Sequence, residues 1–237
     1  MKWEYLLFNC LVFFSSTISI SVYKKAVRPD LRAAAIAISL MAVVFLVWDE
    51  LVKGWFWSFN PAYVLGLQIG RLPFEEVLFF FTVPWSSLIL WLNFRDRIHG
   101  TITMPSVVSW GVSFLFFLLS AQPVTQGWWY TFVVCALSML AVFFMRLKKT
   151  VLRADAAFFG LLTGLMMVFN GYLTSRPVVL YNPETFAGVR LGSVPLEDFL
   201  YGYLLLYGVA QLYLLATSTR VAGNTPVPNL HTREQKK

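Results

Sequence analysis

The sequence predicts an all-α membrane protein with seven transmembrane helices. Of its 237 residues, 58% are hydrophobic and only 13% are charged, and the mean hydropathy is +0.65. Soluble domains usually contain about a quarter charged residues. A second observation is that seven apolar stretches, each long enough to cross a bilayer, follow one another at 3–22, 31–52, 74–94, 104–121, 128–145, 153–174 and 195–217. These stretches leave no room for a soluble domain.

A third observation is an internal repeat. A cluster of proline, glycine and acidic residues occurs twice, and Pro61 and Pro183 mark the same point of the two copies, 122 positions apart. The first copy contains Asn60, Pro61, Gly66, Gly70, Pro73, Glu75 and Glu76, and the second contains Asn182, Pro183, Gly188, Gly192, Pro195, Glu197 and Asp198. The same offset carries the first three apolar stretches onto the last three. We therefore expect two three-helix repeats joined by a linker helix.

Each predicted helix has its place in this scheme. The stretch 3–22 follows Lys2 as a signal peptide would, but it lacks a small-residue cleavage pattern and has a counterpart at 125–144, so it is the first helix of the first repeat. The predicted divisions are 1–100 for the first repeat, 101–122 for the linker helix, 123–217 for the second repeat and 218–237 for a disordered tail. Because four helices separate equivalent positions, the repeats run in parallel.

The positive charges predict the orientation of the chain. Fourteen of the nineteen Lys and Arg residues fall on one side of the seven-helix scheme: Lys24, Lys25, Arg28, Arg32, Arg95, Arg97, Arg146, Lys148, Lys149, Arg153, Arg220, Arg233, Lys236 and Lys237. Cytoplasmic loops are enriched in such residues. The N-terminus is therefore expected outside and the C-terminus in the cytoplasm, and the net charge of +7 reflects topology rather than nucleic-acid binding.

Acidic residues begin the third helix of each predicted repeat. Pro73 and Pro195 are expected at the first helical position, which puts four acids in the first turns: Glu75, Glu76, Glu197 and Asp198. Single acids are common there because the helix dipole favours them. Two adjacent acids in both copies, each leading into an apolar run, are costly to keep in a membrane and indicate a site. Buried carboxyl groups that keep a proton can act as general acids.

Asp49 is a further acid near the outer end of its predicted helix, and its counterpart by repeat is Asn170, one residue out of register. It either caps the helix end or orients one of the glutamates. Loops 53–72 and 175–194 are rich in aromatic residues, which are typical of a membrane interface and also suit a pocket wall. No nucleotide, flavin or metal motif is present, so we expect no cofactor and no metal.

The duplicated motif Pro73-Phe74-Glu75-Glu76 and Pro195-Leu196-Glu197-Asp198 resembles that of the membrane-integral lycopene cyclases. The Trp48-Asp49 element and the run from Asn60 to Pro73 match as well, and the chain is similar to the fused form of two subunits. The resemblance implies conversion of lycopene through γ-carotene to β-carotene by acid catalysis, without net redox change. It implies that Glu75, Glu76, Glu197 and Asp198 are essential, with Asp49 beside them.

The resemblance also implies the partners and the place of the protein. Lycopene and γ-carotene are expected to enter from the bilayer, among membrane lipids. The expected location is a prokaryotic cell membrane. Association with other carotenoid enzymes is also expected. A carbocation intermediate is stabilised by aromatic faces. The expected substrate-binding residues are Trp48, Trp55, Trp57, Asn60, Asn170, Tyr181 and Asn182.

Two other functions compete with this one. A small-solute transporter with three plus one plus three helices has the same helix count and parallel repeats. A carotenoid hydratase forms the same carbocation and lets water capture it. Within the cyclase interpretation, the sequence leaves open which acid donates the proton, with Glu75 and Glu197 as the first choice, and whether the protein has one pocket or two.

Overall fold

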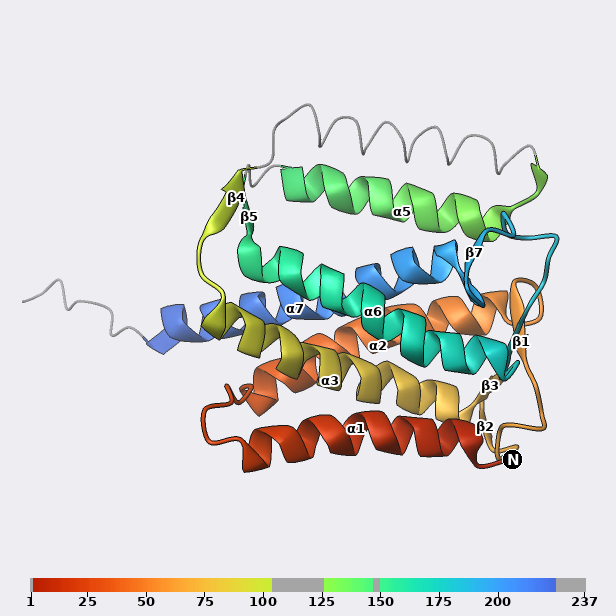
Figure 1. Cartoon of the computed structure of the whole chain (residues 1–237), viewed down its shortest axis with the longest axis horizontal. Helices are drawn as coiled ribbons and strands as arrows, with labels where there is room; N and C mark the ends of the chain where they lie inside the picture. Colours follow the sequence, from red (N-terminus) through yellow and green to blue (C-terminus); the bar gives the residue numbers. More distant parts are fainter. Residues whose placement is uncertain (1, 104–125, 147–149, 225–237) are drawn as a thin grey trace, which may run out of the picture.

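The computed structural model describes residues 2–103, 126–146 and 150–224, and these residues form a helical bundle (Figure 1). Five of the described helices are long and apolar enough to cross a membrane, by length and composition. The helices are α1 (Glu4–Val22), α2 (Leu31–Val52), α3 (Phe74–Arg97), α5 (Trp129–Arg146), α6 (Arg153–Ser175) and α7 (Leu196–Asn224). The sixth, α5, is a shorter apolar helix. The predicted linker helix at 104–121 lies outside the described residues.

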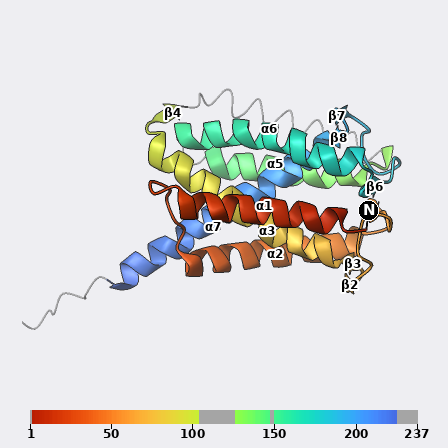
Figure 2. The ribbon, with the colours of Figure 1, turned by 60° about the horizontal axis from the view of Figure 1, so that its bottom comes forward.

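The helix bounds agree closely with the predicted stretches, with two differences. Pro73 precedes α3 instead of opening it: its φ of −59° is helical but its ψ of 146° is extended, and Phe74 is the first helical residue. The helix α7 continues to Asn224, seven residues into the predicted tail, because no proline interrupts it before Pro226. Its end projects beyond the other helices (Figures 1 and 2).

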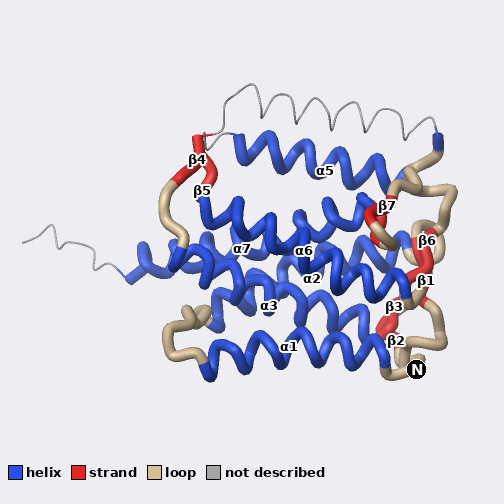
Figure 3. Tube along the Cα trace, in the orientation of Figure 1, coloured by secondary structure: helices blue, strands red, loops and turns tan. Residues whose placement is uncertain are grey.

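Short strands, which the all-α prediction did not include, organise the connections between helices (Figure 3). At one end of the bundle, β4 (Thr101–Thr103) pairs with β5 (Thr150–Leu152). At the other end, β1 (Trp57–Phe59) pairs with β6 (Val179–Tyr181). Two hairpins lie at that same end, β2 (Gln68–Ile69) with β3 (Leu72–Pro73) and β7 (Arg190–Leu191) with β8 (Val194–Pro195). Loops 53–72 and 175–194 thus meet at one end.

Contacts at this end come in pairs that are 122 residues apart. The antiparallel ladder of β1 and β6 has Ser58 opposite Leu180, so each strand pairs with its own counterpart. Asn60 N–H donates to Val178 O at 2.9 Å, and Asn182 N–H donates to Phe56 O at 2.8 Å. Both hairpins turn at a glycine with positive φ, Gly70 at +61° and Gly192 at +65°, a conformation that favours glycine. Each hairpin leads directly into a helix that begins with the acidic motif.

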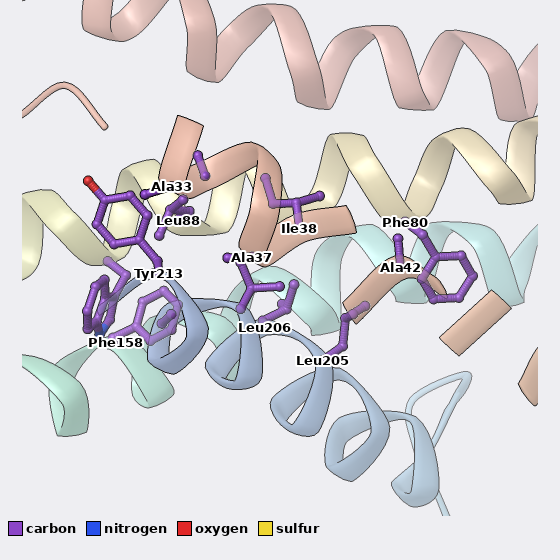
Figure 4. Packing of buried hydrophobic residues seen from close by; sticks show 14 of the residues in the cluster. Ala33, Ala37, Ile38, Ala42, Phe80, Leu88, Phe158, Leu205, Leu206 and Tyr213 are labelled. Carbon is purple, nitrogen blue, oxygen red and sulfur yellow. The ribbon is translucent and has the colours of Figure 1, made fainter. Parts of the chain in front are cut away.

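The core lies where α2, α3, α6 and α7 meet (Figure 4). The helix α3 is central and packs against α1, α2, α6 and α7. Small side chains of α2, among them Ala33, Ala37 and Ala42, are almost completely buried and let the helices approach closely. Larger side chains such as Phe80, Trp91 and Phe158 fill the space between them. The outward face of α1 is apolar and exposed at Leu7, Leu11, Phe14 and Ile18, as expected of a helix that faces lipid.

Candidate active site

Four buried acids begin α3 and α7, next to the two hairpins. Glu75 is completely buried, and Glu76, Glu197 and Asp198 are at most 7% exposed. Consecutive residues of a helix point about 100° apart. The two acids of each motif therefore face different surroundings, and the structure separates them into two kinds.

Glu75 and Glu197 face the loops. Leu65 N–H donates to Glu75 Oε1 at 2.6 Å, and Ala187 N–H, 122 residues later, donates to Glu197 Oε1 at 3.1 Å. Glu197 Oε1 also accepts a hydrogen bond from the Thr131 hydroxyl at 2.5 Å. Neither acid is among the residues that line the cavity described below. These two glutamates, the first choice for the proton donor on sequence grounds, each accept a loop N–H at Oε1, and the Oε2 atom of each is buried without a hydrogen-bond partner among the described residues.

Glu76 and Asp198 face a cavity of about 450 Å³ inside the bundle. The Tyr5 hydroxyl donates to Glu76 Oε2 at 2.5 Å. The Asp198 carboxyl group accepts three hydrogen bonds, which come from Tyr130 Oη at 3.0 Å, Tyr181 Oη at 2.5 Å and Asn170 Nδ2 at 2.8 Å. One acid from each predicted repeat thus reaches the same cavity.

Asp49 joins this group from α2. It is 1% exposed and lines the same cavity. Tyr201 of α7 donates a hydrogen bond to Asp49 Oδ1 at 2.7 Å. The carboxyl groups of Asp49 and Glu76 are neighbours in this cavity and interact electrostatically. Asn170, the predicted counterpart of Asp49, lies beside Asp198 and donates a hydrogen bond to it.

Tyr181 lies outside the membrane-spanning helices, in β6, and its half-buried side chain lines the cavity. Burial and the neighbouring Asp198 carboxylate raise the pKa of the Tyr181 hydroxyl well above its ordinary value. Tyr181 therefore keeps its proton and remains a hydrogen-bond donor to Asp198 at neutral pH.

Other predicted binding residues divide between the cavity and the loops. Trp57 lines the cavity with Asn170 and Tyr181. Trp48 packs on Phe56 outside the lining, and Trp55 is 51% exposed. The side chains of Asn60 and Asn182 accept hydrogen bonds from Ala62 N–H and Glu184 N–H, and Asn182 also donates to Trp55 O, so these two asparagines shape turns.

Three tyrosines of the site, Tyr5, Tyr130 and Tyr201, were not predicted. Each has its hydroxyl on an acid that lies far away in the sequence. A tyrosine in an apolar helix needs a hydrogen-bond partner for its hydroxyl. This requirement is the sequence signal that could have identified these tyrosines as partners of the acids.

The rest of the cavity is mainly apolar. Its walls come from α1, α3, α6 and α7 and include Phe8, Val83, Leu162, Phe169 and Leu205. Serines of α1 and α3 line it away from the acids: Ser15, Ser16, Ser19, Ser86 and Ser87. Among the described residues, no three His, Cys, Asp or Glu side chains are grouped so as to hold a metal ion. The site is an apolar cavity with carboxyl and hydroxyl groups converging at one end.

Comparison with known proteins gives two matches. A family model described as lycopene cyclase matches residues 2–94 and 127–216. The chain is also 27% identical over 118 residues to a bifunctional lycopene cyclase/phytoene synthase of Gibberella fujikuroi. That match covers 47% of this chain and 20% of the fungal protein, so the chain corresponds to a small part of that relative. No solved structure matches.

Proposed function

The chain belongs to the lycopene cyclase family, and on this basis we propose that it converts lycopene through γ-carotene into β-carotene in a prokaryotic cell membrane. The observation that carries the proposal is the convergence of Asp49, Glu76 and Asp198 at one end of an apolar cavity. A hydrocarbon substrate offers only double bonds to an enzyme. Protonating one of them needs an acid in a dry site, and these three residues supply it.

The proton comes from the Asp49–Glu76 pair in this mechanism. Two neighbouring carboxyl groups in an apolar cavity cannot both be ionised easily, so we expect the pair to keep one proton. Tyr5 and Tyr201 donate hydrogen bonds to the pair from two other helices and fix its orientation. The pair adds its proton to the terminal double bond of lycopene, and a tertiary carbocation forms.

Ring closure and loss of a proton complete the reaction. The neighbouring double bond attacks the cation, which closes the six-membered ring and moves the positive charge onto the ring. Asp198, which accepts three hydrogen bonds, is suited to remain a carboxylate. It stabilises the charge and removes a proton from the ring carbon. One proton is gained and one is lost, so the substrate is isomerised without redox change.

Aromatic rings beside the acids support the cationic intermediate. Trp57 and Tyr130 pack against each other with their centroids 5.2 Å apart, and both line the cavity. Trp57 also packs on Tyr201. The faces of such rings attract cations electrostatically.

The proposal includes the predicted topology. Seven spans, two parallel repeats and an outer N-terminus place the acids near the outer surface of the membrane. The paired contacts of β1 with β6, and of Glu75 and Glu197 with their loops, support a two-fold relation between the halves. One shared cavity, lined by Asp49 and Glu76 of the first half and by Asp198 of the second, supports a single site that treats the two ends of lycopene in turn.

Expression of the full chain in lycopene-accumulating bacteria tests the function. Pigments are extracted and separated by chromatography. The proposal expects β-carotene, with γ-carotene at early times. Unchanged lycopene at good expression contradicts it, and hydroxylated products indicate a hydratase.

A further inference from the structure

The cavity holds an unpaired polar group far from the acids. Ser87 of α3 is 4% exposed and lines the cavity, and its hydroxyl has no hydrogen-bond partner among the residues that the structure describes. Burying a hydroxyl without a partner is unfavourable. A serine in a helix normally relieves this by bonding to the carbonyl one turn earlier, but the Ser87 hydroxyl does not.

The neighbouring serines differ from Ser87 in this respect. Ser16 and Ser86 bond to each other at 2.8 Å, and Ser86 also donates to Val12 O at 2.9 Å. Their hydroxyls join α1 to α3. The residue 122 positions after Ser87 is Val209, so the second half has no equivalent hydroxyl. Ser87 is therefore required neither by the packing of α1 nor by the repeated scaffold.

The distance between Ser87 and Glu76 determines the length of a substrate that could reach both. Glu76 and Ser87 are on the same helix and eleven residues apart. Eleven residues make about three turns, so both side chains lie on one face, about 16 Å apart along the axis. An extended carbon chain advances about 1.2 Å per bond, so about 13 bonds separate a double bond at Glu76 from an atom at Ser87.

We propose that Ser87 is a binding subsite for an oxygen atom of the substrate, and that the enzyme also cyclises linear polyene aldehydes of about half the length of lycopene. This inference rests on the proposed function, because it uses the same acids. A chain that carries a carbonyl about 13 bonds from its terminal double bond places the oxygen at Ser87. The hydroxyl then donates the hydrogen bond that it does not make to the protein.

The reaction at the other end is the same isomerisation. The terminal double bond takes a proton, the ring carbon–carbon bond forms, and a proton leaves the ring. The aldehyde is neither oxidised nor reduced and no other reactant is consumed. The product is a ring-bearing polyene aldehyde that is isomeric with the substrate. A reaction that cuts a linear polyene at its middle must supply this substrate.

The test compares two substrates on the same membranes that contain the full chain. One is lycopene, and the other is the acyclic aldehyde obtained by cutting lycopene at its central double bond. The inference expects ring formation with both substrates. The Ser87→Ala variant is expected to lower the ratio of aldehyde to lycopene rates by about five- to tenfold, as loss of one hydrogen bond predicts.

Thr163→Val is the matched control, since it removes a helix hydroxyl that is already bonded within the protein and does not line the cavity. It is expected to leave the ratio unchanged. If lycopene is cyclised and the aldehyde is not, the inference fails and the proposed function stands. If neither substrate reacts, the proposed function fails as well. If the aldehyde reacts with the same ratio in wild type and Ser87→Ala, Ser87 is not the subsite.

Discussion

Tyr201 donates a 2.7 Å hydrogen bond to Asp49, across 152 residues of sequence and from one half of the chain to the other. The acceptor is the carboxyl group that also lies beside Glu76. The proton donor of the proposed reaction is therefore oriented by a helix of the opposite half. Neither half alone contains the complete site.

Removing this hydroxyl tests the link between the halves. Tyr201→Phe is expected to slow ring formation by about tenfold, because one hydrogen bond that fixes the donor pair is lost. The measurement is the initial rate of lycopene loss in membranes with matched protein content. Tyr203→Phe is the control, since the Tyr203 hydroxyl bonds to Thr163 of α6 and lies away from the acids. Equal rates in the two variants contradict the role assigned to Tyr201.

Asp198 is expected to be the base. Asp198→Asn keeps the size of the side chain and an oxygen for hydrogen bonding but removes the carboxylate, so ring formation should fall by about 100-fold or more. Asp155→Asn makes the same change at another buried acid, which bonds to Trp91 and Tyr207 outside the cavity. This control is expected to keep most of its activity. A similar loss in both variants would point to a general effect of removing buried charge.

Gly202 provides a test of the cavity itself. A Cβ atom at Gly202 comes within 2.5 Å of Met166 Cε, and both residues line the cavity. Gly202→Ala is expected to push the methionine side chain into the substrate's space and slow ring formation by about tenfold. Met166→Ala in the same chain should restore activity. Gly164→Ala, with no atom within 4 Å of the new Cβ, should leave the rate of ring formation unchanged. A lower rate in Gly164→Ala, or no recovery when Met166→Ala is added to Gly202→Ala, rejects this placement of the substrate.

The sequence predicted the six helices that the structure describes, while the predicted linker helix at 104–121 lies outside the described residues. Apolar stretches between charged loops gave the bounds of α2 and α6 to within a residue, since burial in lipid requires continuous hydrophobicity. The duplication identified both acidic motifs, and Asp49 was noticed separately as an acid near the end of an apolar stretch. The aromatic loops also gave Trp57 and Tyr181, two residues of the cavity wall.

The direction in which each acidic side chain points could not be predicted from the sequence. Glu75 and Glu76 differ by 100° of helix rotation, and the loop that returns to bond Glu75 determines which of them turns inward. The tyrosine partners are set by packing of helices that are distant in sequence, as in the case of Tyr5 and Glu76. Glu75 and Glu197 were preferred as proton donors without knowledge of which acids face the cavity.

The central claim is that the inner acids carry out the chemistry while the outer acids hold the loops. Its most direct test is the rate of ring formation from lycopene in Glu75→Gln and Glu76→Gln, adjacent residues that undergo the same change. A glutamine at position 75 can still accept the hydrogen bond from Leu65, so its rate should stay within about tenfold of the wild type. Glu76→Gln removes half of the donor pair and should lose about 100-fold or more. A greater loss in Glu75→Gln than in Glu76→Gln would contradict the account.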